Sequence, residues 1–427
     1  MDALSDRPLV VEREREFFVS TSAYRSEALF QEEMQKIFYR NWIFLCHESE
    51  IANPGDYKST WIGLQPVVVV RDGSGKINAF LNFCPHRGAA LCRHEYGNTK
   101  AFVCPYHGWT YRVTGELLTV TDKQRYPAEL DASKLGLLKV NRVTSYSGLV
   151  FGLLADDGPD LETYLGGAKR YIDLWLARSA GGSYKVDRAH KYKFPANWKM
   201  QVENTTDGYH PNFVHRSAFA AFQEVFGSYA QQAGDQGTAF QGGATRGFPG
   251  GHSTLERSYA AIAAQQAPKE AVDAYVNAIK ATYGDEAFDD IASTRHVVIF
   301  PNLALMDYNI RVIQPMAVDR TDVYSYFVSI EGASKEINGG RLSNLQTRLG
   351  TAGMVGGDDI EIFAANQTGM MAEVAKWIVL SRGMGLEKIL DSGEHIGIYS
   401  DEVPQRAFWR QWRNVMGNFV GHEEQFA

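Results

Sequence analysis

Cys84-Pro85-His86-Arg87-Gly88 and Cys104-Pro105-Tyr106-His107-Gly108-Trp109 are the two stretches that decide the fold of this chain. Each stretch offers one thiol and one imidazole, and each contains a proline and a glycine, which favour tight loops. Thiolates and imidazoles are ligands that zinc and iron accept in proteins. The two stretches therefore predict one metal centre, and its ligands would be Cys84, His86, Cys104 and His107.

The spacing of these ligands favours an iron-sulfur cluster over zinc. Structural zinc modules place about two to four residues between paired ligands, whereas only Pro85 separates Cys84 from His86. In a Rieske two-iron two-sulfur cluster, imidazoles replace the thiolates on one iron, which raises the reduction potential. A third interpretation, four core residues without a metal, leaves the repeated proline and glycine unexplained. We therefore expect a Rieske cluster and a protein that transfers electrons.

A second metal centre is expected around Asp207-Gly208-Tyr209-His210-Pro211 and the later His215. On one unbroken helix His210 and His215 would point roughly 140° apart, because each residue turns about 100°. Pro211 disfavours the helical conformation in the residue before it, and proline itself suits the start of a helix. We therefore expect one helix to end near His210 and another to begin near Pro211, so that both imidazoles can face one site.

A carboxylate for this second centre is expected downstream, in Gly356-Gly357-Asp358-Asp359-Ile360-Glu361. Two histidines and one carboxylate form the facial triad of non-haem ferrous oxygenases, which leaves coordination positions open for dioxygen and water. The residues alone leave four carboxylates open as the third ligand: Asp358, Asp359, Glu361 and Glu203.

Together these motifs resemble the large (α) subunit of Rieske non-haem iron aromatic-ring-hydroxylating oxygenases. The matching elements are C-P-H-R-G, C-P-Y-H-G-W, N-W-K-x-x-x-E-N at 197–204, D-G-Y-H at 207–210, a later histidine, and D-D-x-E at 358–361. The resemblance runs from about Tyr39 to Trp412, nearly the whole chain. The D-G-Y-H form and the stretch 400–406 are most similar to the benzoate, toluate and anthranilate dioxygenase group.

The resemblance implies a role for each site residue. Cys84, His86, Cys104 and His107 would bind the cluster, and His210, His215 and Asp359 would bind a mononuclear iron. Asp359 is chosen because the family ligand is the second aspartate of its pair. Asp207 would link the two metal centres by accepting hydrogen bonds from imidazoles on both sides, and we class it as catalytic. The alternative role for Asp207 is a helix-terminal cap, because Asp before Gly is also common in turns.

The resemblance also implies the reaction and the partners. The chain would be a terminal oxygenase that uses dioxygen, and electrons relayed from NADH, to hydroxylate a small aromatic substrate to a cis-dihydrodiol or a hydroxylated product. An aromatic carboxylate is among the expected substrates. No Gly-x-Gly-x-x-Gly motif joins a strand to a helix, so NADH would bind a separate reductase, with or without a ferredoxin. The expected assembly is α3β3 with a small β subunit, or α3. The alternatives are a Rieske monooxygenase acting as an O- or N-demethylase, and an electron carrier without oxygenase activity.

Composition agrees with a large enzyme that binds neither nucleic acid nor membrane. A net charge of -7, without a block of like charges, disfavours nucleic acid. The longest apolar runs are far shorter than the roughly 20 residues that span a bilayer. The first residues lack the apolar stretch of a signal peptide. Four cysteines, two of them assigned to iron, leave no disulfide framework. We therefore expect a cytoplasmic protein.

The predicted fold class is α+β. An N-terminal helical segment (1–39) would pack on the catalytic domain, a β-rich Rieske domain would span 40–155, and a catalytic domain (156–427) would pack helices on an antiparallel sheet. Residues 226–258 are rich in glycine and glutamine, and we expect either a mobile loop over the active site or plain disorder. Residues beside the iron ligands are expected to line the substrate pocket or to pack around it: Val202, Phe213, Val214, Phe219, Phe222, Asn302, Leu303, Leu305 and Val355.

Overall fold

A computed structural model describes residues 8–127, 131–226, 243–260, 267–350 and 353–417. The chain divides into two compact units, Phe38–Thr163 and a larger unit that joins Met1–Ile37 to Tyr164–Ala427. The limits expected from the sequence, 39/40 and 155/156, stay predictions of the domain boundaries. No helix of the described residues is long and apolar enough to cross a membrane.

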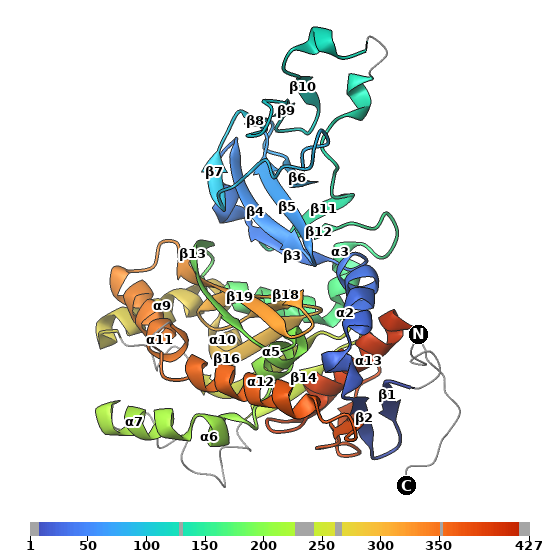
Figure 1. Cartoon of the computed structure of the whole chain (residues 1–427). Helices are drawn as coiled ribbons and strands as arrows, with labels where there is room; N and C mark the ends of the chain where they lie inside the picture. Colours follow the sequence, from blue (N-terminus) through green and yellow to red (C-terminus); the bar gives the residue numbers. More distant parts are fainter. Residues whose placement is uncertain (1–7, 128–130, 227–242, 261–266, 351–352, 418–427) are drawn as a thin grey trace. The chain divides into compact units, whose positions relative to one another are not determined.

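The smaller unit consists of three antiparallel sheets (Figure 1). One has the order β6-β5-β4-β7, one the order β10-β9-β8, and one the order β11-β12-β3. The turn sequence Arg71-Asp72-Gly73-Ser74-Gly75-Lys76 between two apolar runs predicts a hairpin, and β5 and β6 form it. Asp72 closes the turn, because its carboxylate accepts from the backbone N–H groups of Ser74 and Lys76. The strands are β3 (Ile43–His47), β4 (Asp56–Ile62), β5 (Gln65–Arg71), β6 (Ile77–Leu81), β7 (Tyr96–Asn98), β8 (Ala101–Val103), β9 (Thr110–Arg112), β10 (Leu117–Thr119), β11 (Arg142–Tyr146) and β12 (Leu149–Leu153).

The larger unit is built on a nine-stranded antiparallel sheet with the order β13-β19-β18-β17-β16-β15-β14-β22-β21. A separate sheet joins β1, β2 and β20. The strands are β1 (Val10–Glu12), β2 (Phe17–Ser20), β13 (Tyr184–Phe194), β14 (Gly243–Gly247), β15 (Ser253–Ala260), β16 (Ser293–Ile299), β17 (Leu303–Leu305), β18 (Asn309–Ala317), β19 (Arg320–Ile330), β20 (Trp377–Val379), β21 (Lys388–Ile389) and β22 (His395–Ile398).

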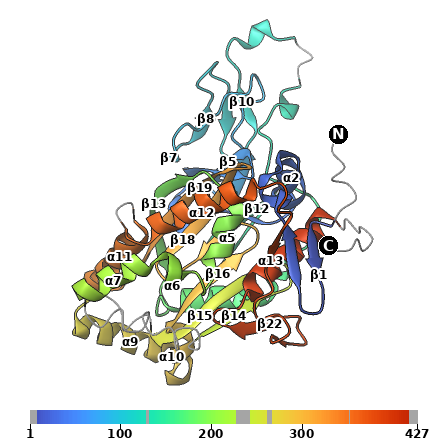
Figure 2. The same cartoon turned by 60° about the horizontal axis from the view of Figure 1, so that its bottom comes forward.

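Helices of the larger unit cover this sheet, as the α+β class predicts. α5 packs on β16 and β18, α12 packs on β13, and α13 packs on β14 and β15 (Figure 2). The helices are α1 (Ser22–Arg25), α2 (Glu27–Glu33), α3 (Leu161–Leu165), α4 (Lys169–Ala177), α5 (Trp198–Thr205), α6 (Pro211–Val214), α7 (Arg216–Phe226), α9 (Lys269–Tyr283), α10 (Asp285–Ala292), α11 (Lys335–Leu349), α12 (Gly356–Met370) and α13 (Val403–Met416).

One expectation about this unit is wrong in part. Residues 243–247 and 253–260 form the paired strands β14 and β15 inside the nine-stranded sheet, so they are not a loop. Pairing with β16 and β22 on either side outweighs the weak strand propensity of a glycine-rich sequence. Residues 227–242 of the predicted mobile loop lie outside the described residues.

Candidate metal centres

The two cysteine and histidine stretches form loops with the same backbone hydrogen bonds. In the first, the N–H of Cys84 donates to the carbonyl of Ala89 and the N–H of Gly88 donates back to Cys84. In the second, the N–H of Cys104 donates to the carbonyl of Trp109 and that of Gly108 donates back to Cys104. Both glycines have positive φ, 77° and 71°, which disfavours other residues there. The two loops therefore place their cysteines equivalently, whereas His86 follows its cysteine by two residues and His107 follows its cysteine by three.

The side chains of these loops converge. Cys84 and Cys104 are buried, and the rings of His86 and His107 lie 4.6 Å apart between centroids. The Nδ1 atoms of both rings are buried without a hydrogen-bond partner in the described part of the protein. An unpartnered buried nitrogen is costly unless a ligand occupies it. Two thiols and two open imidazole nitrogens fit the donor set of a Rieske cluster.

Aromatic side chains surround this donor set. Trp109 stacks on the ring of His86 at 4.7 Å with an interplanar angle of 3°, and Tyr106 lies against His107. The hydroxyl of Tyr111 lies 3.2 Å from Sγ of Cys84. Burial raises the pKa of the Cys84 thiol, and the Tyr111 hydroxyl opposes that rise.

The second centre lies where α5 ends and α6 begins. α5 ends at Thr205, five positions before His210, and α6 begins at Pro211, with Pro211 in its first turn and His210 at its N-cap. The predicted break is therefore present, although the first helix ends earlier than expected. His215 directly follows α6, and its ring lies 5.4 Å from that of His210.

Asp359, in the first turn of α12, completes this second group. One ligand atom each from His210, His215 and Asp359 lies within 4.8 Å of the other two. Oδ1 of Asp359 is 3.2 Å from Nε2 of His215 and 3.6 Å from Nε2 of His210. Two side chains from the ends of α6 and one from α12 thus point their donor atoms at one position, as a facial triad requires.

The other candidate carboxylates are placed differently. Glu203 is partly buried and accepts hydrogen bonds from the Tyr24 hydroxyl at 2.6 Å and the Trp409 indole at 2.8 Å. Burial raises the pKa of Glu203 to about 7. Glu361 is exposed. Asp358 faces the far edge of the His215 ring, with Oδ2 at 3.3 Å from Nδ1.

Asp207 caps a turn and also contacts one imidazole of this group. Its Oδ1 accepts from the backbone N–H groups of Tyr209 at 2.6 Å and His210 at 3.2 Å, so it caps the turn before α6. Its Oδ2 lies 3.4 Å from Nδ1 of His210, on the ring edge away from Asp359. A carboxylate there can orient the imidazole.

Sequence reasoning missed two contacts at this site. The side-chain amide nitrogen of Asn204 lies 3.1 Å from Nε2 of His210 and 3.1 Å from Oδ1 of Asp359, beside the point on which the ligand atoms converge. Asp358, considered only as a ligand, instead holds the ring of His215. Asn204 ends the N-W-K-x-x-x-E-N motif, so its position in that motif was the available sequence signal.

The residues predicted to line or surround the pocket do not all face one site. Phe213 is 62% exposed, so it does not line an enclosed pocket formed by the described residues. The ring of His296 contacts the end of α5 and shares a sheet face with Ala304. Leu303 and Leu305 alternate with Ala304, so they point to the opposite face, away from α5.

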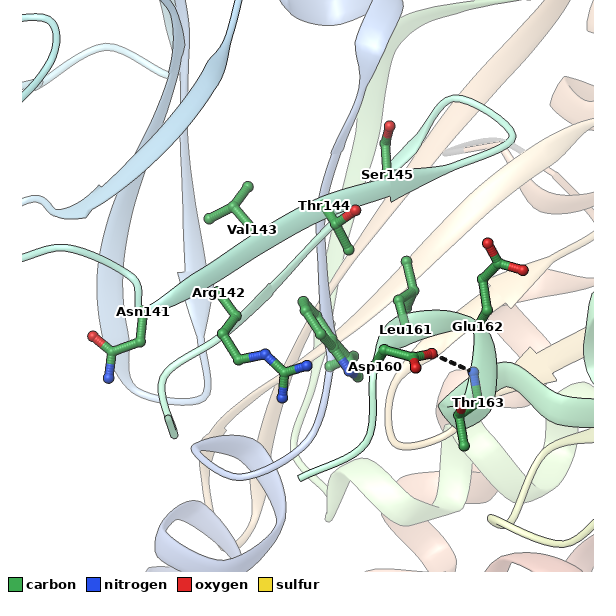
Figure 3. A pocket seen from close by; sticks show the side chains of 10 residues that line it. Asn141, Arg142, Val143, Thr144, Ser145, Asp160, Leu161, Glu162 and Thr163 are labelled. Carbon is green, nitrogen blue, oxygen red and sulfur yellow. Dashed lines mark hydrogen bonds between the residues drawn. The ribbon is translucent and has the colours of Figure 1, made fainter. Parts of the chain in front are cut away.

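A cavity of about 660 Å³ lies elsewhere, in the smaller unit (Figure 3). Its lining comes from Trp42, residues 141–145 and residues 160–163. The Arg142 guanidinium stacks 4.9 Å from the Trp42 ring, and Asp160 accepts from the backbone N–H of Thr163. None of the predicted site residues lines this cavity.

Comparisons with known proteins match two regions of the chain. Residues 41–141 match the family model of the Rieske 2Fe-2S domain, and residues 182–418 match that of the ring hydroxylating alpha subunit, catalytic domain. The large subunit of 2-halobenzoate 1,2-dioxygenase from Burkholderia cepacia is 35% identical over 370 residues, covering 84% of this chain and 78% of the relative. The alpha subunit of toluate 1,2-dioxygenase from Pseudomonas putida is 34% identical over 403 residues, covering 90% and 88%.

Solved structures agree with these relatives. Naphthalene 1,2-dioxygenase with indole bound in its active site has a TM-score of 0.86 at 27% identity, covering 98% of this chain and 95% of the other. The sequence motifs, the matched domains and the shared fold all lead to one assignment. The chain belongs to the family of large (α) subunits of Rieske non-haem iron aromatic-ring-hydroxylating oxygenases.

Proposed function

We propose that the residues brought together in the two centres are the metal ligands of this oxygenase. Cys84, His86, Cys104 and His107 would hold the cluster, and His210, His215 and Asp359 the mononuclear iron. The observation that carries the proposal is the meeting of the last three ligand atoms within 4.8 Å. When bound, the cluster supplies single electrons and the iron supplies the site at which dioxygen is activated.

An iron count tests this assignment. The holoprotein should contain about three irons per chain, two in the cluster and one mononuclear. His210→Ala or His215→Ala should remove the third iron and the oxygenase activity, and the visible absorption of the cluster should survive. Loss of the cluster absorption in either variant would show that the ligands are wrongly divided between the centres.

As a member of this family the chain is the terminal oxygenase component of an aromatic-ring-hydroxylating system that depends on NADH. We propose an aromatic carboxylate as its substrate. Both relatives at 34–35% identity are named for substituted benzoates, and relatives named for naphthalene are 31–33% identical. The product would be a cis-dihydrodiol, or a hydroxylated arene after loss of water.

A substrate panel tests this choice. Benzoate, anthranilate, salicylate, biphenyl and naphthalene should be compared for product formation and coupled oxygen uptake. We expect turnover of at least one of the three acids with a dihydrodiol or hydroxylated product. Turnover confined to biphenyl and naphthalene would refute the carboxylate. Formaldehyde release from methoxy- or N-methyl-arenes, without ring oxidation, would favour the demethylase alternative.

Exposed apolar side chains of a cluster loop and of the segments beside the two loops support docking of a partner. Phe83 is 40% exposed, Val103 58%, Tyr106 56% and Leu118 48%. Exposed apolar patches often mark protein interfaces. We propose that this surface meets a reductase or ferredoxin and a neighbouring α subunit, within an α3β3 or α3 assembly in the cytoplasm. Light scattering that finds a fully active monomer would contradict the assembly.

Asp207 is proposed to connect the two centres across that subunit boundary. Its Oδ2 faces Nδ1 of His210, which otherwise has no hydrogen-bond partner in the described structure. Asp207→Asn keeps the shape and removes the charge. In single-turnover experiments the variant should keep its irons but transfer electrons slowly from reduced cluster to mononuclear iron. A normal transfer rate would refute the link, and loss of the mononuclear iron would indicate that the cap is the main role.

A further inference from the structure

Arg311 lies in β18, on the sheet face that α5 covers (Figure 2). Its register partners are Ala304 of β17 and Ser325 of β19. Ala304 shares its face with His296, whose Nδ1 lies 2.9 Å from the carbonyl of Thr205 at the end of α5. Because directly opposed residues of antiparallel strands project to the same face, the Arg311 side chain also points toward α5. This is the side of the sheet on which α5 ends beside the mononuclear iron ligands.

Tyr192 of β13 gives a second measure of where the guanidinium of Arg311 lies. Its partner in β19 is two residues from that of Arg311, so both side chains project to one face. The Tyr192 hydroxyl donates to Oε1 of Gln201 in α5 at 2.8 Å. Burial raises the pKa of Tyr192, the charge of Arg311 opposes that rise, and the charge of Asp359 adds to it. One phenol between the sheet and α5 thus senses both the guanidinium and a proposed iron ligand.

The Arg311 guanidinium is buried without a counter-ion among the described residues. Arg311 is only 3% exposed, and its Nε has no hydrogen-bond partner there. Two acids act electrostatically on the groups around it. Asp307 is held by Arg178 at 2.5 Å, and Asp359 is assigned to the iron. A guanidinium stays charged in proteins, so a buried one without an anion is costly.

Two other buried arginines of the same unit are paired with acids. Arg295 contacts Glu256, and Arg406 contacts Glu387. Their charges are balanced within the fold, whereas that of Arg311 is left for a group that is not part of the described structure. A carboxylate suits this position, because its two oxygens match the planar fork of a guanidinium and can accept two parallel hydrogen bonds.

We propose that Arg311 binds the carboxylate of the aromatic substrate and thereby sets the preference of this oxygenase for an acid. The inference rests on the proposed function, in which the substrate is an aromatic carboxylate. A buried charge pair is screened by solvent and salt much less than an exposed one. Substrate binding would therefore supply the anion that the fold does not provide.

This role makes Arg311 a specificity-determining residue that touches the substrate but not its reacting carbons. Anchoring the carboxylate orients the ring at the iron site, so loss of the anchor should raise KM more than it lowers kcat. A neutral arene would leave the buried cation unpaired, and the site should therefore discriminate against it.

The test compares each acid with its own amide, which has nearly the same shape and no charge. The holoenzyme is assayed with benzoate, anthranilate and salicylate, and with benzamide, 2-aminobenzamide and salicylamide. Arg311→Met removes the charge and keeps an unbranched side chain. KM for the best acid should rise about 10- to 100-fold, the usual effect of losing a hydrogen bond to a charged group. The ratio of kcat/KM for that acid to kcat/KM for its amide should fall by a similar factor. This ratio does not depend on the fraction of active enzyme.

Two further variants separate binding from a role in folding. Arg311→Lys keeps the charge but loses the planar fork, so it should retain part of the preference for the acid. Arg341→Met is the matched control, because Arg341 is also buried in this unit and its Nη2 donates to the Val328 carbonyl. Its ratio should equal that of the wild type. In urea without substrate, Arg311→Met should unfold at the same or a higher concentration than the wild type, since it removes an unpaired buried charge.

The outcomes distinguish this inference from the proposed function. If the wild type turns over none of the three acids, the proposed function fails and the inference fails with it. If the wild type turns over an acid and Arg311→Met keeps its KM and its ratio, Arg311 does not bind the carboxylate and the proposed function stands. An equal fall of the ratio in Arg341→Met would also overturn the inference. Unfolding of Arg311→Met at a clearly lower urea concentration would mean that Arg311 has a partner within the fold, which contradicts the proposal.

Discussion

Asp358→Asn should weaken binding of the mononuclear iron without touching a ligand. Nε2 of His215 faces Asp359 and the proposed iron, so Nδ1 must carry the proton and donate to Asp358 at 3.3 Å. The His215 side chain is only 3% exposed, so water cannot readily replace Asp358. The Asp358 carboxylate can only accept, so it fixes the His215 tautomer with the proton on Nδ1 and also fixes the ring plane. An asparagine can instead turn its amide N–H toward Nδ1, which would favour the other tautomer.

The size of the effect follows from the environment of the pair. Loss of a carboxylate that orients a metal-bound histidine typically costs about 10–100-fold in metal affinity, or about 1.4–2.7 kcal/mol. The Asp358 side chain is 33% exposed, and solvent screens an exposed carboxylate. We therefore expect the lower end of the range, about tenfold.

The assay is an anaerobic titration of ferrous iron into protein from which the mononuclear iron has been removed. The absorption of the cluster serves as the internal reference for folded protein. Glu361→Gln is the matched control, because Glu361 is an exposed acid on the same helix α12. Asp358→Glu should restore part of the affinity. Equal dissociation constants for wild type and Asp358→Asn, or equal losses in the two neutralised variants, would refute the reasoning.

Three further predictions concern the support of the centres. Burial lowers the pKa of His252 to about 4, so as pH falls the unfolded chain binds the proton before the folded protein does. The free energy of unfolding should therefore fall by about 3 kcal/mol between about pH 6.5 and pH 4. In urea titrations of His252→Gln, the dependence of that free energy on pH should correspond to about one proton less. Lys199→Met leaves the buried Glu33 carboxylate without its partner at 2.6 Å and should cost about 3–5 kcal/mol in the same titrations, more than the double variant with Glu33→Gln. Gly208→Ala would drive a Cβ into the carbonyl of Tyr399, so it should lower mononuclear iron content and spare the cluster in an iron assay.

The parts of the site that sequence could predict are those in which chemistry and spacing are local. Each cluster loop combines its ligands with a proline and a glycine in one short stretch. Pro211 predicts the helix break that turns His210 and His215 toward each other. The hairpin after β5 followed from a turn sequence between two apolar runs. The α+β class followed from such patterns repeated along the chain.

The parts that sequence missed depend on contacts between distant segments. Nothing near Glu203 reveals that Tyr24 and Trp409 hold its carboxylate. The sequence around Cys84 does not indicate its contact with the Tyr111 hydroxyl, because Tyr111 lies on β9, distant in sequence. The strands β14 and β15 were missed because partners on both sides, rather than local propensity, stabilise them.

Those distant contacts explain how α5 can hold an iron site at its end. Lys199, near the start of α5, pairs with the buried Glu33 of α2, and Glu33 also accepts from the Trp412 indole of α13. One turn later Glu203 is held by Tyr24 and by α13. A buried ion pair on one turn and hydrogen bonds to Glu203 on the next fix this helix, so it cannot slide or rotate without leaving polar groups unpartnered, which is costly. Asn204 follows Glu203 directly, so the geometry at the proposed iron depends on the N-terminal segment and on α13, which lie far from the ligands in sequence. Substitutions in those segments should therefore disturb the geometry of the mononuclear iron centre more than that of the cluster.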